Sequence, residues 1–112
     1  MNSTALMLPV LPGKRERLFE FAKALSGERA HEYATSQESV TQETWYLQAT
    51  SMGDFLIVHY EAPNPAGVLA ALAGSTEPFD VWFREQAREI TGIEFSQPTG
   101  DLAQIVFHYR KG

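Results

Sequence analysis

The run from Asp54 to Glu61 constrains the fold most, because it reads as a β-strand with large apolar or aromatic side chains on both faces. The preceding run, 42–49, is separated from it by a short turn containing Gly53, so the two predict an antiparallel hairpin. Antiparallel sheets commonly leave one face in contact with water. The helices of so short a chain cover only one face, so we expect a second copy of the chain to cover the other.

Apolar spacing and turn residues predict the elements before the hairpin. Residues 4–10 read as a short first strand, and a helix begins after Pro12-Gly13. Its apolar residues recur at i, i+3, i+4 and i+7, the spacing of one buried stripe, and Ser26-Gly27 ends or kinks the helix. A second, more polar helical stretch from residue 28 to about 36 turns Tyr33 inward. The stripe of the first helix consists of Leu18, Phe21, Ala22 and Leu25.

Two helices and a strand are expected after the hairpin. Asn64-Pro65 is typical of a helix start, with an N-cap and a proline at the first helical position. Gly74 ends that helix, and Pro78 begins another that closes at Gly92 with a left-handed cap. Residues 102–109 read as a last strand, again without a polar side.

The element order β-α-β-β-α-β predicts one ferredoxin-like α+β domain over residues 1–112, with its second helical region split in two. Right-handed connections place four antiparallel strands in the order 4-1-3-2, with the helices on one face. The other face is then apolar and uncovered, which indicates an interface. We therefore expect a homodimer that packs sheet to sheet and encloses a barrel-like interior, where a small-molecule pocket would lie.

This order, size and two-sided sheet resemble the dimeric α+β barrel superfamily, which includes cofactor-independent monooxygenases, stress-responsive barrels and haem-degrading enzymes. The segments 53–58, 78–83 and 91–93 look like those of a group of small uncharacterised proteins of that fold. The resemblance implies a fold but no reaction. Haem-degrading members use an Asn, Trp and His set, whereas this chain has no Asn within the expected first strand, so no catalytic residue carries over.

Composition argues against several classes of function. A net charge of -5 opposes nucleic-acid binding, which needs concentrated basic residues. The absence of cysteine excludes disulfides, thiol nucleophiles and cysteine-based metal sites, and permits a reducing cytoplasm, which we take as the expected location. No stretch approaches the ~20 apolar residues that span a bilayer, so no membrane association is expected. We expect no cofactor and no metal.

His59 is the best candidate for a catalytic residue, because it is an ionisable side chain inside an otherwise apolar strand. If buried and neutral near pH 7, it could accept a proton. The register that we favour places it opposite Tyr46 and avoids setting Glu61 against Glu43. The alternative is a core histidine whose hydrogen bonds are satisfied. His108 should lie roughly 10 Å from His59, two strand spacings away, too far to share a metal ion.

Trp45, Tyr33 and Trp82 are the other candidate ligand-binding residues, since aromatic rings make flat walls for a planar ligand. The expected function is a small homodimer that binds an apolar or aromatic molecule between sheet and helices. If it is an enzyme, cofactor-independent oxygenase or isomerase chemistry fits best, with His59 as the base. The alternative is a non-catalytic dimeric module for ligand binding or interaction. The sequence leaves open whether the protein is an enzyme.

Overall fold

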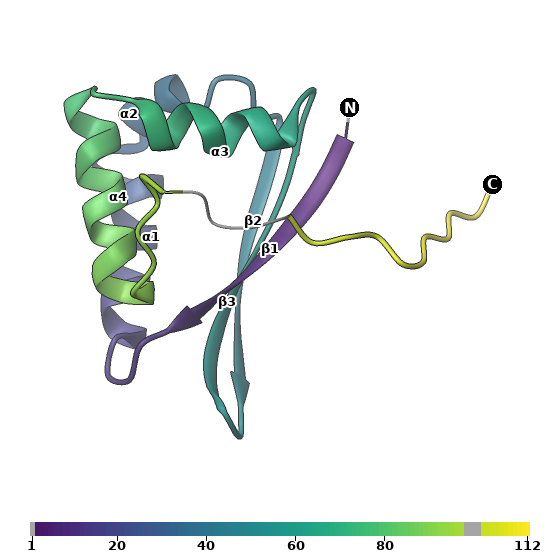
Figure 1. The fold of residues 1–112 in the computed structure, drawn as a ribbon, viewed down its shortest axis with the longest axis horizontal. Coiled ribbons are helices and arrows are strands. Elements are labelled where there is room, and N and C mark those ends of the chain that lie inside the picture. Colours follow the sequence, from purple (N-terminus) through teal and green to yellow (C-terminus); the bar gives the residue numbers. More distant parts are fainter. Residues whose placement is uncertain (1, 98–101) are drawn as a thin grey trace.

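The computed structural model describes residues 2–97 and 102–112. Its elements are β1 (Asn2–Val10), α1 (Arg15–Ser26), α2 (Ala30–Ser36), β2 (Gln42–Thr50), β3 (Gly53–Ala62), α3 (Pro65–Gly74) and α4 (Pro78–Thr91) (Figure 1). The strands form one antiparallel sheet in the order β1-β3-β2. The α+β class, this relative order of three strands and the divided second helical region are as predicted.

The predicted turn residues fix the ends of the helices. The Asn64 side chain accepts a hydrogen bond from the backbone N–H of Gly67 at 3.2 Å, which caps α3. Gly92 ends α4 in the left-handed conformation, with φ of 76°, and its N–H donates to the carbonyl of Arg88 at 2.7 Å. These local signals therefore act here as the sequence indicates.

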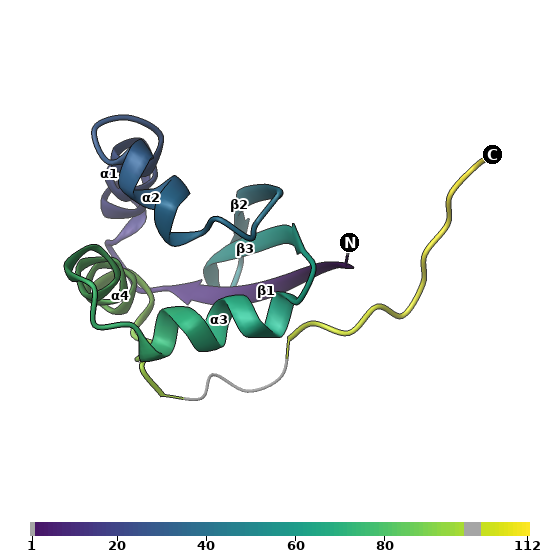
Figure 2. The same ribbon diagram turned by 90° about the horizontal axis from the view of Figure 1, so that it is seen from above.

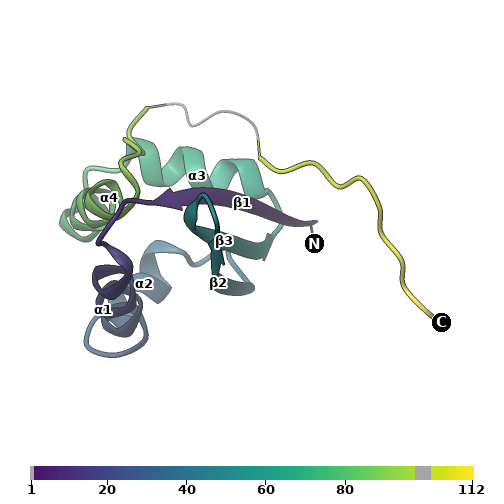
Figure 3. The same ribbon diagram turned by 90° about the horizontal axis from the view of Figure 1, so that it is seen from below.

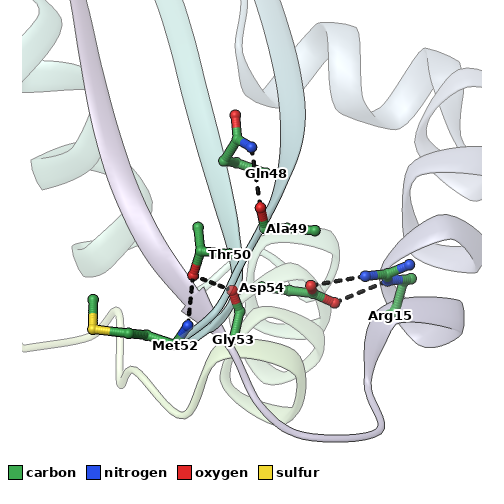
Figure 4. A network of polar contacts seen from close by, with 7 residues as sticks. All are labelled: Arg15, Gln48, Ala49, Thr50, Met52, Gly53 and Asp54. Carbon is green, nitrogen blue, oxygen red and sulfur yellow. Dashed lines mark hydrogen bonds and ion pairs between the residues drawn. The ribbon is translucent and has the colours of Figure 1, made fainter.

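The hairpin turn contains only Ser51 and Met52, because Thr50 already pairs with Gly53. The Thr50 hydroxyl accepts from the N–H of Met52 at 3.1 Å and donates to the carbonyl of Gly53 at 2.7 Å (Figure 4). Beside the turn, both carboxylate oxygens of Asp54 accept hydrogen bonds of 2.8 Å from Arg15, which joins the hairpin to the start of α1. The hairpin and the first helix are thereby held together at one end of the molecule.

This turn sets a register that differs from the predicted one. His59 lies opposite Thr44, two positions earlier than the expected partner Tyr46. The prediction was wrong because the two-residue turn lies at Ser51 and Met52, one residue earlier than that register requires. Tyr46 instead lies opposite Ile57.

The core lies on one face of the sheet. Alternate residues of β3 are buried there, and side chains from all four helices pack on the same side. Figure 2 shows α1, α2 and α4 gathered beside the strands, with α3 running alongside β1. The opposite face, which we call the bare face, carries half-buried residues of β3 instead. The buried row consists of Leu56, Val58, Tyr60 and Ala62.

The fourth strand predicted at 102–109 is not part of this sheet: residues 102–112 have neither helix nor strand. The N–H of Ala103 donates to the carbonyl of Ala5 at 3.0 Å, and the chain then runs away from the body (Figures 1 and 3). β1 begins at Asn2, three residues before Ala5, so little of the strand extends beyond this contact in the direction of the segment. Asn2 also belongs to β1, which starts two residues earlier than expected.

Candidate functional site

A cavity of about 70 Å³ lies between the core face of the sheet and the helices. Most of its lining is apolar, so it would favour an apolar occupant. Its volume is about half of the ~150 Å³ that accommodates benzene in an engineered cavity. A planar aromatic ligand would therefore need side chains of the wall to move. The apolar wall includes Leu8, Phe21, Leu56, Val58, Leu72 and Ile90.

Three polar side chains at one side of the cavity form a hydrogen-bonded group that we call the carboxylate cluster: Tyr33, Glu43 and Trp45. One carboxylate oxygen of Glu43 accepts from the Tyr33 hydroxyl at 2.5 Å. The other accepts from the indole N–H of Trp45 at 2.6 Å. Neither donor carries a charge, and none of the ion pairs found in residues 2–97 and 102–112 includes Glu43. The cluster therefore presents a carboxylate without a cation to an apolar cavity.

The strand and helix positions explain how the cluster forms. Glu43 and Trp45 are two residues apart on β2, so their side chains lie on the same face of the sheet, here the core face. Tyr33 extends from α2 to meet them, and its ring stacks on that of Phe83 with centroids 5.8 Å apart. Sequence reasoning missed Glu43 as a site residue. The available signal was its two-residue spacing from Trp45 on a strand.

The carboxylate cluster also separates the cavity from two open surface hollows. One hollow is formed by all three cluster residues together with the end of α1, at Ala22 and Leu25. The other is formed by Tyr33 and Glu43 with the segment that joins α2 to β2. A ligand that reaches the cavity from either hollow would have to displace part of the cluster.

Two tyrosines near Glu43 have raised pKa values. Burial is the main cause of the raised pKa of Tyr33, and the charge of Glu43 and its hydrogen bond raise this pKa further. Burial, followed by the charge of Glu43, raises the pKa of Tyr60 to about 12. The Tyr60 hydroxyl donates to the carbonyl of Pro65 at 2.7 Å. Both phenols are therefore protonated at neutral pH and serve as hydrogen-bond donors rather than bases.

The structure brings together two of the four residues suggested by the sequence. Tyr33 and Trp45 line the cavity. Trp82 packs against Phe21, with ring centroids 5.6 Å apart, and the Arg29 guanidinium lies 4.0 Å from its ring centre, outside the cavity lining. His59 is half-buried on the bare face, on the opposite side of the sheet from the cavity.

The bare face is organised as rows of residues that cross all three strands. Its central row is apolar and consists of Met7, Ile57 and Tyr46, of which Met7 is 65% and Tyr46 56% exposed. His59 belongs to the neighbouring row, between Ala5 and Thr44. The row therefore brings apolar side chains together on the side of the sheet opposite the core.

No group of three or more His, Cys, Asp or Glu side chains suited to a metal ion occurs in the part of the chain that the structure describes. In the same ranges, no helix has the length and apolar character needed to cross a membrane. Comparisons with protein-family models, with curated proteins and with solved structures gave no match.

Proposed function

We propose that this protein is a homodimer that binds a small apolar or aromatic molecule in the cavity beside the carboxylate cluster. The observation that carries the proposal is an apolar cavity whose wall presents one carboxylate held by two neutral donors. Apolar lining supplies affinity, and a few placed polar groups orient a ligand. Trp45 and Tyr33 are the walls that would move to admit a ring.

The homodimer forms through the bare face in this proposal, because its central row is apolar and no helix within residues 2–97 and 102–112 covers it. Packing two such faces would give the dimeric α+β barrel that the element order resembles. In that assembly the segment 102–109 would add a fourth strand to one of the two sheets. The cytoplasmic location stays a prediction.

Catalysis is the second candidate function, and Glu43 is the observation that supports it. A carboxylate can remove a proton from the carbon next to a carbonyl group of an otherwise apolar substrate, so that the electron pair forms an enolate, and can return the proton to another carbon; this isomerase-like chemistry needs no cofactor. Glu43 lines the cavity, whereas His59 does not, so Glu43 replaces His59 as the proposed base. The Tyr33 hydroxyl and the Trp45 N–H would hold the carboxylate in place.

Binding can be tested with benzene and indole as probes, by calorimetry and by the fluorescence of the tryptophans. We expect both probes to bind to the wild type and binding to be lost in Ala87→Leu, because Ala87 is buried in the cavity wall and a larger side chain fills the space. Ala71→Leu is the matched control, since Ala71 is exposed on α3. Failure of both probes to bind to the wild type, or unchanged binding in a folded Ala87→Leu variant, would contradict the proposed pocket.

The same preparation separates binding from catalysis. Cyclohexanone in D₂O reports proton removal through deuterium uptake at its α-carbons, which NMR detects. Glu43→Gln keeps the shape of the side chain and removes the base, so a catalytic Glu43 predicts retained probe binding with loss of exchange. Exchange at the wild-type rate in the variant would exclude Glu43 as the base.

A further inference from the structure

The segment 102–109, which we call the arm, contains four of the exposed large apolar side chains among the residues that the structure describes. The exposed fractions are 66% for Ile105, 94% for Val106, 76% for Phe107 and 72% for Tyr109. Figures 1 and 3 show the arm leaving the body beside the start of β1. Consecutive apolar side chains at this exposure mark a surface that another protein covers.

The sheet of the same chain cannot pair the whole arm. The hydrogen bond from Ala103 to Ala5 sets an antiparallel register in which Val106 would reach Asn2, the first residue of β1. Residues from Phe107 onward would then pass the end of the strand.

The outer edge of β2 offers a longer free row. The pairing of Thr50 with Gly53 next to a two-residue turn directs the backbone groups of even-numbered residues of β2 toward β3. The backbone groups of Glu43, Trp45, Leu47 and Ala49 therefore point outward, and the hydrogen bond found to them within the described ranges is from the exposed Gln48 side chain to the Ala49 carbonyl, at 3.1 Å. This row spans positions 43–49, the same length as 103–109, and contains no proline.

The size of the bare face indicates that a dimer needs more contact than this face provides. Three strands ~4.8 Å apart and nine residues long at ~3.3 Å each give a flat area of roughly 400 Å². A stable interface buries about 800 Å² on each partner. Among the described residues, the arm carries four of the exposed large apolar side chains and could supply the difference.

We propose that the arm of each chain pairs as an added strand with the outer edge of β2 in a second copy. The exchange rests on the proposed homodimer and extends it, since each copy then completes the sheet of the other. Backbone hydrogen bonds along 43–49 would supply affinity, and the alternating side chains of the arm would continue the apolar surfaces of the partner's sheet.

Crosslinking can test the pairing without background, because the chain contains no cysteine. One chain carries Val106→Cys, and a second chain with a tag of different mass carries Gln48→Cys on β2. After mixing and exchange of subunits, a short bismaleimide should join the two chains. Ser3→Cys, at an exposed position of β1, replaces Gln48→Cys as the control and should give little product. A product confined to the Ser3→Cys chain, or no product between differently tagged chains, would overturn the pairing with β2.

Sedimentation of full-length variants tests the contribution of the arm to assembly. Phe107→Ser should raise the dimer dissociation constant at least tenfold while leaving the circular dichroism spectrum unchanged, because Phe107 lies outside the core. Met52→Ser makes a comparable change at an 85% exposed residue of the hairpin turn and should leave the constant unchanged. A wild-type dimer that is insensitive to Phe107→Ser would overturn the arm exchange alone. A monomeric wild type would overturn the homodimer as well, whereas probe binding to the cavity is measured independently.

Discussion

At the scale of single residues, the environment of Glu43 is the most informative. Both of its oxygens accept short hydrogen bonds from neutral donors, at 2.5 Å from Tyr33 and 2.6 Å from Trp45. Satisfying both oxygens reduces the cost of placing a carboxylate beside an apolar cavity. The three side chains hold one another in position, and they form the wall through which a ligand would enter.

The tyrosines near Glu43 should make the protein lose stability in alkali. The pKa of Tyr60 is about 12 in the folded chain against 10.0 for a free tyrosine, and that of Tyr33 is also raised. Between these values the unfolded chain binds fewer protons than the folded chain. The free energy of unfolding therefore falls as the pH rises above 10, by up to ~1.4 kcal/mol per pH unit for each tyrosine.

Urea unfolding at pH 9, 10 and 11 measures this loss. The free energy of unfolding of the Tyr33→Phe variant should fall less steeply with pH than that of the wild type, because the substitution removes one of the two buried phenols. Tyr46→Phe removes an exposed phenol of the bare face and serves as the control. Parallel pH profiles for Tyr33→Phe and the wild type would show that Tyr33 is not the source of the decline.

At the scale of elements, Asp80 joins three parts of the helical layer. It lies in the first turn of α4 and is only 8% exposed. The hydroxyl of Ser36, at the end of α2, donates to one oxygen of Asp80, and that of Ser75, after α3, donates to the other at 2.6 Å. A negative side chain in the first turn also interacts favourably with the helix dipole. Asp80 therefore fixes α2, α3 and α4 relative to one another.

Asp80→Ala should lower the free energy of unfolding by roughly 1–3 kcal/mol, because two partly buried hydroxyls lose their acceptor. Asp80→Asn keeps one acceptor oxygen and should lower the free energy of unfolding by less than Asp80→Ala. Glu77→Ala is the control, since Glu77 precedes the same helix but makes no capping hydrogen bond with its side chain. Urea denaturation of the variants gives the comparison, and equal effects of Glu77→Ala and Asp80→Ala would refute the role of Asp80 in joining the helices.

At the scale of the whole molecule, one face of the sheet holds the core and cavity, and the other carries the apolar row of Met7, Ile57 and Tyr46. Ile57→Glu should convert the proposed dimer to a monomer without loss of helix content, because Ile57 is not part of the core. Ile57→Val retains the apolar surface and should remain dimeric. Sedimentation and circular dichroism measure the two effects, and a dimeric Ile57→Glu variant would exclude the bare face as the interface.

Local chemistry let the sequence determine most of the elements. Proline, glycine and Asn64 mark the helix ends, and apolar spacing identifies the buried sides of α1 and α4. Strand alternation separates Leu56, Val58 and Tyr60 from His59 and its neighbours, since successive side chains point to opposite faces. These signals depend only on nearby residues, so they can be recognised without a structure.

The tertiary structure alone decided which row of β3 faces the helices, because alternation is symmetric between the two faces. That choice places His59 on the bare face and brings Glu43 to the cavity, where Tyr33, ten residues earlier, reaches it. The position of the two-residue turn, at Ser51 and Met52, fixed the register of the hairpin. Contacts between residues distant in sequence thus determined the site. The strand 54–61, with apolar side chains on both faces, had already indicated from the sequence a sheet whose second face its own chain leaves uncovered.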